Sequence, residues 1–373
     1  MTQAVLHTRR GRIGLLLAAG AIIGGVLVWR APDLDLIGRA FTEVGWKWVA
    51  AAIGMNLLSV QVRAIAWHIV LNEALPPPHP RHRHVFAAFC VGLLGNAVLP
   101  GRVGEVARVG VLARHVPRHR DTWASIFGSV FAHRLFDVIP AIGLVVYVVV
   151  TARIPRWALP AVEVMIGVGA ALLLAGIAVA LRQRRQGQRS LDGLGRIRRL
   201  GVQALQGMRV FHSPGSALAA GFFQLLGWAT QLFAVYFAMR AFNIDEPIAA
   251  AALVLLVVNV ALAFPLWPGS FGLFQVAVAV ALLPYGIAYR HGFAFGIGLQ
   301  AIEMSVGVGL GLLYLAREGI SFAMLKNIPR VTDGLGEETP PARPTPTGPP
   351  ALPRVPSRRP APRIGSRATE RVG

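Results

Sequence analysis

Long apolar segments dominate the first 320 residues of this chain. A helix needs about 20 apolar residues to cross the hydrocarbon core of a bilayer, where it bonds its backbone groups internally. Only 14% of the residues are charged, against about a quarter in ordinary soluble domains, which argues against a soluble fold. The sequence therefore predicts an all-α membrane protein whose spanning segments are Ile13–Val28, Val49–Leu71, Phe131–Val150, Ala158–Leu181, Ala217–Met239 and Phe293–Leu315.

The net charge of +20 is arranged in blocks. Arginines gather between the apolar segments and in the C-terminal tail, as they do in cytoplasmic loops under the positive-inside rule. A strongly basic chain can indicate binding to nucleic acid, but this distribution of the charge argues against it. We expect both termini and the loops Asn72–His84 and Arg182–Arg209 in the cytoplasm, and the mixed loop Arg30–Lys47 outside.

The sequence does not predict a metal ion or a cofactor. Cys90 is the only cysteine, which excludes an intrachain disulfide and a four-thiolate site. His79, His82 and His84 lie in a basic, Pro-rich loop without the spacing of a zinc-binding helix.

The apolar run Val85–Leu99 conflicts with a simple alternation of spans. Basic residues follow it directly, at Arg108, Arg114, Arg118 and Arg120, and a full span would place them outside. A re-entrant hairpin that breaks at Pro100-Gly101 and restarts near Gly104 keeps both basic ends in the cytoplasm. Proline lacks an amide donor and glycine permits unusual dihedral angles, so the pair suits a break.

A second broken segment runs from Ile248 to Leu283 and predicts a hairpin that enters from the outside. Its motif, Pro268-Gly269-x-x-Gly272, repeats that of Pro100-Gly101-x-x-Gly104. Polar residues flank the two breaks at similar distances: Gln61, Arg63 and Gln231 before them, and Arg134 with Asp137 and Gln300 with Glu303 after them. We therefore expect about six spanning helices and two re-entrant hairpins in an inverted repeat, countable as seven or eight transmembrane helices.

Two regions are expected along the chain: a transmembrane domain over residues 1–325 and a cytoplasmic tail over residues 326–373. The tail is rich in proline and arginine, and such a segment cannot bury a core. It is therefore predicted to be disordered.

Polar residues at membrane depth are the candidate substrate-binding site, because a charge at the centre of a spanning helix costs about 2.5–3.5 kcal/mol on insertion scales. Glu105 can pair with Arg108, and Arg134 with Asp137, since each pair is three residues apart on a helix. A half-helix that begins near Gly104 would present free amides and Arg102 to a phosphate. The candidates are Asn96, Arg102, Glu105, Arg108, Arg134, Asp137, Ser270, Gln275, Gln300 and Glu303.

Structural roles are the alternative for the same residues. The charges can neutralise one another and lock the hairpin to its neighbours, as structural ion pairs do. Asn96 can cap the break, and Ser270 and Gln275 can be packing residues. His133, beside Arg134, is a further residue to test.

The run from Asn96 to Arg108, Asn-Ala-Val-Leu-Pro-Gly-Arg-Val-Gly-Glu-Val-Ala-Arg, resembles the lysylphosphatidylglycerol synthase transmembrane-region family, also called flippase-like membrane proteins. His133-Arg134-Leu135-Phe136-Asp137 and Pro268-Gly269-Ser270-Phe271-Gly272 fit the same pattern. The resemblance covers about the first 320 residues. It implies the lipid-translocating part of such synthases, without their cytosolic aminoacyl-transferase domain.

The leading hypothesis is a lipid translocator of the bacterial inner membrane that is not an enzyme. Its lipid could be a phospholipid, an aminoacylated phospholipid, a hopanoid or a polyprenyl-linked lipid. The alternative is a non-transporting subunit that docks a glycosyltransferase or a lipid-synthesis enzyme through the Arg182–Arg209 loop and the tail. A third hypothesis, an intramembrane enzyme that uses Glu105 or Asp137, lacks a nucleophile or metal signature.

Overall fold

The computed structural model describes residues 42–99, 103–117, 122–153, 167, 209–263 and 268–319. These residues belong to the first of two units, Met1–Pro329 and Arg330–Gly373. The described residues form eight α-helices and no strand, which confirms the all-α prediction. Several predictions lie outside them: the span Ile13–Val28, the span Ala158–Leu181 except residue 167, the Arg182–Arg209 loop except its last residue, the break residues Pro100 and Gly101 with Arg102, and the tail 326–373.

Four long helices match four of the predicted spans: α4 (Trp46–Ala74), α7 (Thr122–Thr151), α10 (Pro214–Ala241) and α13 (Tyr289–Arg317). Each is apolar and long enough to cross a membrane. At 1.5 Å per residue, a helix of about 29 residues is roughly 43 Å long, so its ends extend past a hydrocarbon core of about 30 Å. These four helices indicate a multi-pass membrane protein.

Four shorter helices interrupt this series in two pairs: α5 (His82–Val98) with α6 (Gly104–Ala113), and α11 (Ile248–Ala263) with α12 (Leu273–Leu282). Each pair stands between two long helices, so one order of elements occurs twice. The interruptions fall where the two Pro-Gly motifs predict them.

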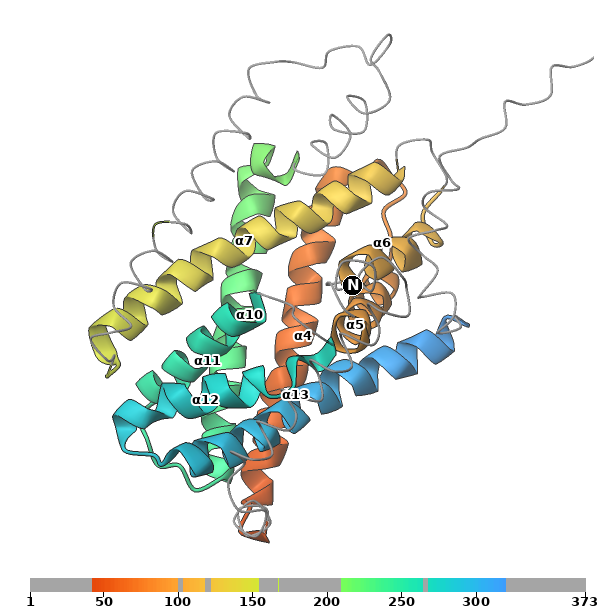
Figure 1. The fold of residues 1–373 in the computed structure, drawn as a ribbon. Helices are drawn as coiled ribbons and strands as arrows, with labels where there is room; N and C mark the ends of the chain where they lie inside the picture. Colours follow the sequence, from red (N-terminus) through yellow and green to blue (C-terminus); the bar gives the residue numbers. More distant parts are fainter. Residues whose placement is uncertain are drawn as a thin grey trace, which may run out of the picture. The chain divides into compact units, whose positions relative to one another are not determined.

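The long helices α4 and α10 lie side by side and run in opposite directions (Figure 1). At one end the Gly45 amide donates to the Ala241 carbonyl at 2.9 Å, and at the other the Ser216 hydroxyl donates to the Glu73 carboxylate at 2.5 Å. Between them, the Ser59 hydroxyl donates to the Gly227 carbonyl at 2.8 Å. Small residues let the two backbones approach, as is usual between membrane helices.

Helix α13 contacts both short pairs. Its first half packs on α12, where a Cβ on Gly292 would lie 2.8 Å from the Ala279 Cα atom. Its second half packs on α5, where a Cβ on Gly311 would lie 2.9 Å from the Cys90 carbonyl oxygen. Glycine is therefore required at both contacts, because any side chain would push the helices apart.

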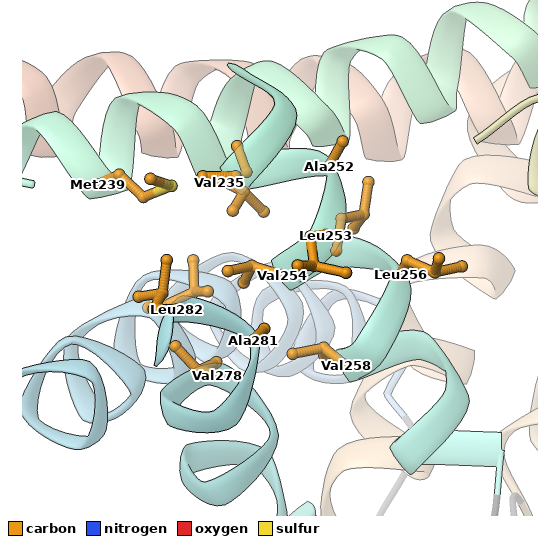
Figure 2. Packing of buried hydrophobic residues seen from close by; sticks show 14 of the residues in the cluster. Val235, Met239, Ala252, Leu253, Val254, Leu256, Val258, Val278, Ala281 and Leu282 are labelled. Carbon is orange, nitrogen blue, oxygen red and sulfur yellow. The ribbon is translucent and has the colours of Figure 1, made fainter. Parts of the chain in front are cut away.

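Two apolar clusters form most of the buried core. The first joins α10, α11 and α12, and Figure 2 shows Val235 and Met239 of α10 facing Val254 of α11 and Leu282 of α12. The second surrounds Trp67 of α4 and includes residues of α5, α6 and α7. Each short pair is therefore packed against long helices.

The outer ends of the first short pair lie close together, and each pair contacts the end of a long helix. The rings of His84, at the start of α5, and His115, after α6, stack with centroids 4.1 Å apart, and His115 Nε2 lies 3.1 Å from Glu318 Oε2. In the other pair, the Tyr285 hydroxyl after α12 accepts a bond from the Arg153 amide at 3.3 Å. Each pair thus contacts the end of the last long helix of the opposite half, α13 or α7.

Candidate functional site

A chain of charged groups links α6 to α7. Arg108 Nη2 lies 2.7 Å from Glu105 Oε2, and Arg134 Nη1 lies 3.2 Å from Asp137 Oδ2. Both pairings agree with the predicted spacing. The other Arg134 nitrogen pairs with Glu105, a contact between helices that the sequence did not predict. Arg134 therefore holds one carboxylate of each helix.

Helix α10 supplies the remaining partners of Asp137. The Trp228 indole N–H donates to Asp137 Oδ1 at 2.8 Å, and the Gln224 amide donates to the same oxygen. Sequence reasoning missed both donors. Their signal is the spacing of Gln224, Trp228 and Gln231, which places three polar-edged side chains on one face of an otherwise apolar helix.

Arg63 of α4 is a third guanidinium in this region, noted from the sequence only as a flank of the repeat. It lies over the Trp228 ring, 5.4 Å from the centroid, and its Nε atom is buried without a hydrogen bond. Among the described residues it makes no ion pair within 4 Å, although it interacts electrostatically with Asp137 and Glu303. This cation is therefore not directly neutralised by a described carboxylate.

Arg108 and Arg134 differ in their surroundings. The Arg108 side chain is 4% exposed and lies over the Trp67 ring, 4.7 Å from its centroid. The Arg134 side chain is 46% exposed although it pairs with two carboxylates. Arg108 is thus held in an aromatic environment, whereas Arg134 presents an open face.

His133 fixes α7 to α4. Its ring is buried, and its Nε2 atom lies 3.2 Å from the Arg63 carbonyl oxygen. Because a carbonyl only accepts, this bond requires the proton on Nε2, and Nδ1 has no hydrogen-bond partner. These contacts assign His133 a positioning role beside Arg134.

The contact between α5 and α6 is close at the first break. A Cβ on Gly95 would lie 2.8 Å from the Gly104 Cα atom, and one on Gly104 would lie 2.6 Å from the Asn96 backbone nitrogen. The Asn96 Oδ1 atom is buried without a hydrogen bond, so this oxygen does not cap the break. Arg102 lies outside the described residues, and a phosphate seat formed with it stays a prediction.

The second break is tied by amides. Gln275 Oε1 accepts from the Gly272 amide at 2.6 Å, Gln275 Nε2 donates to Gln300 at 2.5 Å, and Gln300 Nε2 donates to the Gly269 carbonyl at 2.6 Å. These amides hold a turn in which Gly269, Ser270 and Gly272 have positive φ angles of 68°, 48° and 84°, a conformation that glycine adopts readily and serine does not. These contacts favour the packing role for Gln275 and extend it to Gln300. A role of Ser270, Gln275 or Gln300 in binding stays a prediction.

Glu303 of α13 stands one turn beyond Gln300 but joins a different set of contacts. Its Oε1 atom accepts from Gln231 Nε2 of α10 at 3.1 Å. Gln231 follows Trp228 by three residues, about 4.5 Å along the helix axis. One face of α10 therefore holds both Asp137 and Glu303.

The family of the lysylphosphatidylglycerol synthase transmembrane region matches residues 15–311. The chain belongs to this family. This confirms the resemblance carried by the run from Asn96 to Arg108. The matched residues include all of α4 to α12 and most of α13. No curated protein matches the chain.

In this member of the lysylphosphatidylglycerol synthase transmembrane-region family, the charged residues of the candidate site divide into two groups. Three guanidinium groups, of Arg63, Arg108 and Arg134, surround the carboxylates of Glu105 and Asp137. Glu303 is the third carboxylate and interacts with the group through Arg63 and through the shared face of α10. The first group alone carries one positive charge in excess.

Proposed function

We propose that this protein moves lipids with a phosphate-bearing headgroup across the bacterial inner membrane, by binding and release and without covalent chemistry. The observation that carries the proposal is the group of three guanidiniums with two carboxylates, which lie on the long apolar helices α4 and α7 and on the short helix α6 between them in the chain. Charges at such depth are costly and are found mainly where a function needs them.

A phosphate diester is the ligand whose chemistry suits this group. It carries one negative charge, equal to the excess of Arg63, Arg108 and Arg134 over Glu105 and Asp137, and guanidinium binds phosphate through two parallel hydrogen bonds. Arg134 is the guanidinium that a headgroup can reach, because its side chain is half-exposed. Glu105 and Asp137 orient Arg134, and Arg108 balances Glu105. Phospholipids, aminoacylated phospholipids and polyprenyl-linked lipids carry such a group.

The order of helices supports two re-entrant hairpins in an inverted repeat. The first helices of the two halves, α4 and α10, run in opposite directions. The ends of the first short pair meet at His84 and His115 and join α4 at its C-terminal side, whereas the second pair follows the C-terminal end of α10. The pairs would then open on opposite faces. With the basic Asn72–His84 loop inside, both termini would be cytoplasmic.

A headgroup-flip assay in proteoliposomes tests the function. Fluorescent phosphatidylglycerol is placed in both leaflets, and its exposure to an external quencher is followed over time. We expect flipping by the wild-type protein and a loss on the order of tenfold or more in Arg134→Gln, since a hydrogen bond to a charged group is worth about 1.5–3 kcal/mol. Arg240→Gln is the matched control, because Arg240 pairs with the exposed Asp245 near the end of α10.

Three outcomes have distinct meanings. Flipping lost in Arg134→Gln but kept in Arg240→Gln supports the proposal, provided that both variants unfold at wild-type temperature. Equal flipping by wild type and Arg134→Gln removes Arg134 from the site. If the wild-type protein flips no lipid, the translocation proposal is wrong, and the non-transporting subunit that docks another enzyme is the function to test next.

A further inference from the structure

Glu303 is a carboxylate at membrane depth that the headgroup site does not use. Among the described residues it has no cation within 4 Å, and its hydrogen bond comes from the neutral amide of Gln231 at 3.1 Å. Glu105 and Asp137 differ, because each is paired directly with Arg134. Of these three carboxylates, Glu303 is therefore the one that can gain or lose a proton without breaking an ion pair.

The Gln231 bond tolerates both protonation states. An amide N–H donates to a carboxylate oxygen, and it donates equally to the carbonyl oxygen of a protonated carboxyl group. By contrast, a proton on Glu105 or Asp137 would neutralise that carboxylate and so remove one of the two ion pairs of Arg134. The contacts of Glu303 are thus suited to reversible protonation.

The charged surroundings of Glu303 are simple. Four described helices pack on α13: α4, α5, α10 and α12. Arg63 of α4 is the cation that interacts with Glu303, and α10 contributes Gln231. Helix α12 has no ionisable residue, and those of α5 are Cys90, beside Gly311, and three residues of its first turn. The charged and titratable groups of α13 itself and just after it lie toward its ends, at Tyr289, Arg290, His291, Tyr314, Arg317 and Glu318.

We propose that Glu303 binds the proton that is exchanged when an anionic lipid headgroup is translocated, an inference that rests on the proposed function. Arg63, Arg108 and Arg134 are balanced by Glu105, Asp137 and an ionised Glu303. A headgroup with one negative charge upsets this balance, and uptake of one proton by Glu303 restores it. When the headgroup leaves, the proton leaves to water on that side. No bond of the lipid changes, and one proton moves with one anion.

Arg63 connects the two binding events. It lies over Trp228, which donates to Asp137, and it interacts electrostatically with both Asp137 and Glu303. A neutral Glu303 leaves the Arg63 charge free to interact with the headgroup. Proton binding and headgroup binding therefore favour each other, and this coupling is reciprocal.

The test is the flip assay under imposed pH gradients of either sign. A gradient of about two pH units corresponds to about a hundredfold in a one-proton equilibrium. We expect the wild-type rate to differ on the order of tenfold between opposite gradients, and the rates of Glu303→Gln to be equal. Glutamine keeps an acceptor for Gln231, which preserves the packing. Glu318→Gln is the matched control, because it removes a carboxylate just after the last turn of α13, away from the site, and it should keep the wild-type ratio.

A second measurement does not depend on transport. Infrared spectra of the protein in lipid nanodiscs should show a protonated-carboxyl band that grows on acidification in wild type and Glu303→Asp and is missing in Glu303→Gln. If Glu303→Gln cannot be reconstituted, two measurements still test the proton site: the ratio of wild-type flip rates under opposite gradients, and the infrared spectrum of Glu303→Asp.

The outcomes separate the two proposals. A wild-type protein that flips lipid at the same rate under both gradients overturns the proton site and leaves translocation standing. A gradient response that persists in Glu303→Gln also overturns it. No flipping under any gradient contradicts the proposed function, and the infrared titration then decides whether Glu303 binds a proton.

Discussion

Arg134 is the residue on which the described charges converge. It pairs with Glu105 of α6 and Asp137 of its own helix, and half of its side chain remains exposed. Asp137 in turn accepts from two side chains of α10. The position of Arg134 thus depends on contacts with other helices, and single substitutions can test these contacts.

Trp228→Phe tests a contact between this group and a neutral side chain. The change removes the indole N–H that donates to Asp137 at 2.8 Å and keeps an aromatic ring below Arg63. Because hydrogen bonds to charged groups contribute about 1.5–3 kcal/mol, we expect a loss of that order in the free energy of unfolding in detergent. Trp46→Phe is the control: its side chain is 73% exposed, and its effect should stay within about 0.5 kcal/mol. Equal effects of the two variants would contradict the assigned contact.

At this scale the sequence predicted the contacts within a helix and missed those between helices. Glu105 with Arg108, and Arg134 with Asp137, follow from a spacing of three residues. The link from Arg134 to Glu105 depends on the register between α6 and α7, which an apolar pattern does not specify. The sequence shows Gln224 and Trp228 on one face of α10, but it does not show that both donate to Asp137.

Among the elements, the short helices α5 and α6 pack closely against each other at the candidate site. Gly95 and Gly104 allow the approach, and Arg108 then lies against Trp67. The spacing between these two helices therefore fixes the position of Glu105 and Arg108.

Gly104→Ala should force α5 and α6 apart. Its Cβ would lie 2.6 Å from the Asn96 backbone nitrogen, and such overpacking costs about 1–3 kcal/mol. We expect a corresponding fall in the free energy of unfolding and a weaker headgroup-flip activity. In the control Gly143→Ala, the added Cβ meets no described atom within 4 Å, and a gain of about 0.4–1 kcal/mol is expected. A neutral Gly104→Ala would show that the helices already have room.

The contact between His84 and His115 predicts a pH dependence. Burial, followed by the neighbouring His115 and Arg83, lowers the pKa of His84, which lies in the first turn of α5 and outside the four long helices. Arg83 Nε donates to His84 Nε2 at 3.1 Å, which also requires the neutral ring. The folded state then binds fewer protons than the unfolded state, so stability falls as pH drops below about 6.5, the ordinary histidine value.

His84→Phe should reduce this loss. Phenylalanine can stack on His115 but carries no charge, whereas Arg81 and Glu318 remain nearby. We expect the unfolding temperature of the wild-type protein to fall more between pH 7.5 and 5.5 than that of the variant, measured by differential scanning fluorimetry. If the unfolding temperatures of the two proteins fall equally with pH, His84 is not the group responsible for the pH dependence.

The ends of α4, α10 and α13 were predicted within four residues, whereas α7 begins at Thr122, nine residues before the predicted Phe131. Helix α13 begins at Tyr289, four residues before the predicted Phe293. The extra turn contains Tyr289, Arg290 and His291, which an apolar count leaves out although such residues suit a membrane surface.

For the whole molecule, α4 and α10 run in opposite directions, so the two proposed hairpins would open on opposite sides of the membrane. Labelling of single cysteines from either side of the membrane tests this arrangement, after Cys90, buried in α5, is replaced by alanine. We expect cysteines at the exposed Arg83 and Arg114 to react from one side, and those at Pro247 and Gly286 from the other. If the cysteines at positions 83 and 114 react from opposite sides, α5 and α6 together span the membrane and do not form a re-entrant hairpin.

The unequal pairing of the charges also has a consequence during biosynthesis. Helices α6 and α7 each carry an acid and a base three residues apart, so each can enter lipid as an internally neutralised segment. Arg63 has no acid within a turn on α4, and its aromatic partner Trp228 belongs to α10. At 5–20 residues per second, synthesis of the intervening chain takes on the order of ten seconds. During that interval the nascent α4 exposes an arginine to lipid or to the insertion machinery, and the site is completed only after all of its helices have been inserted.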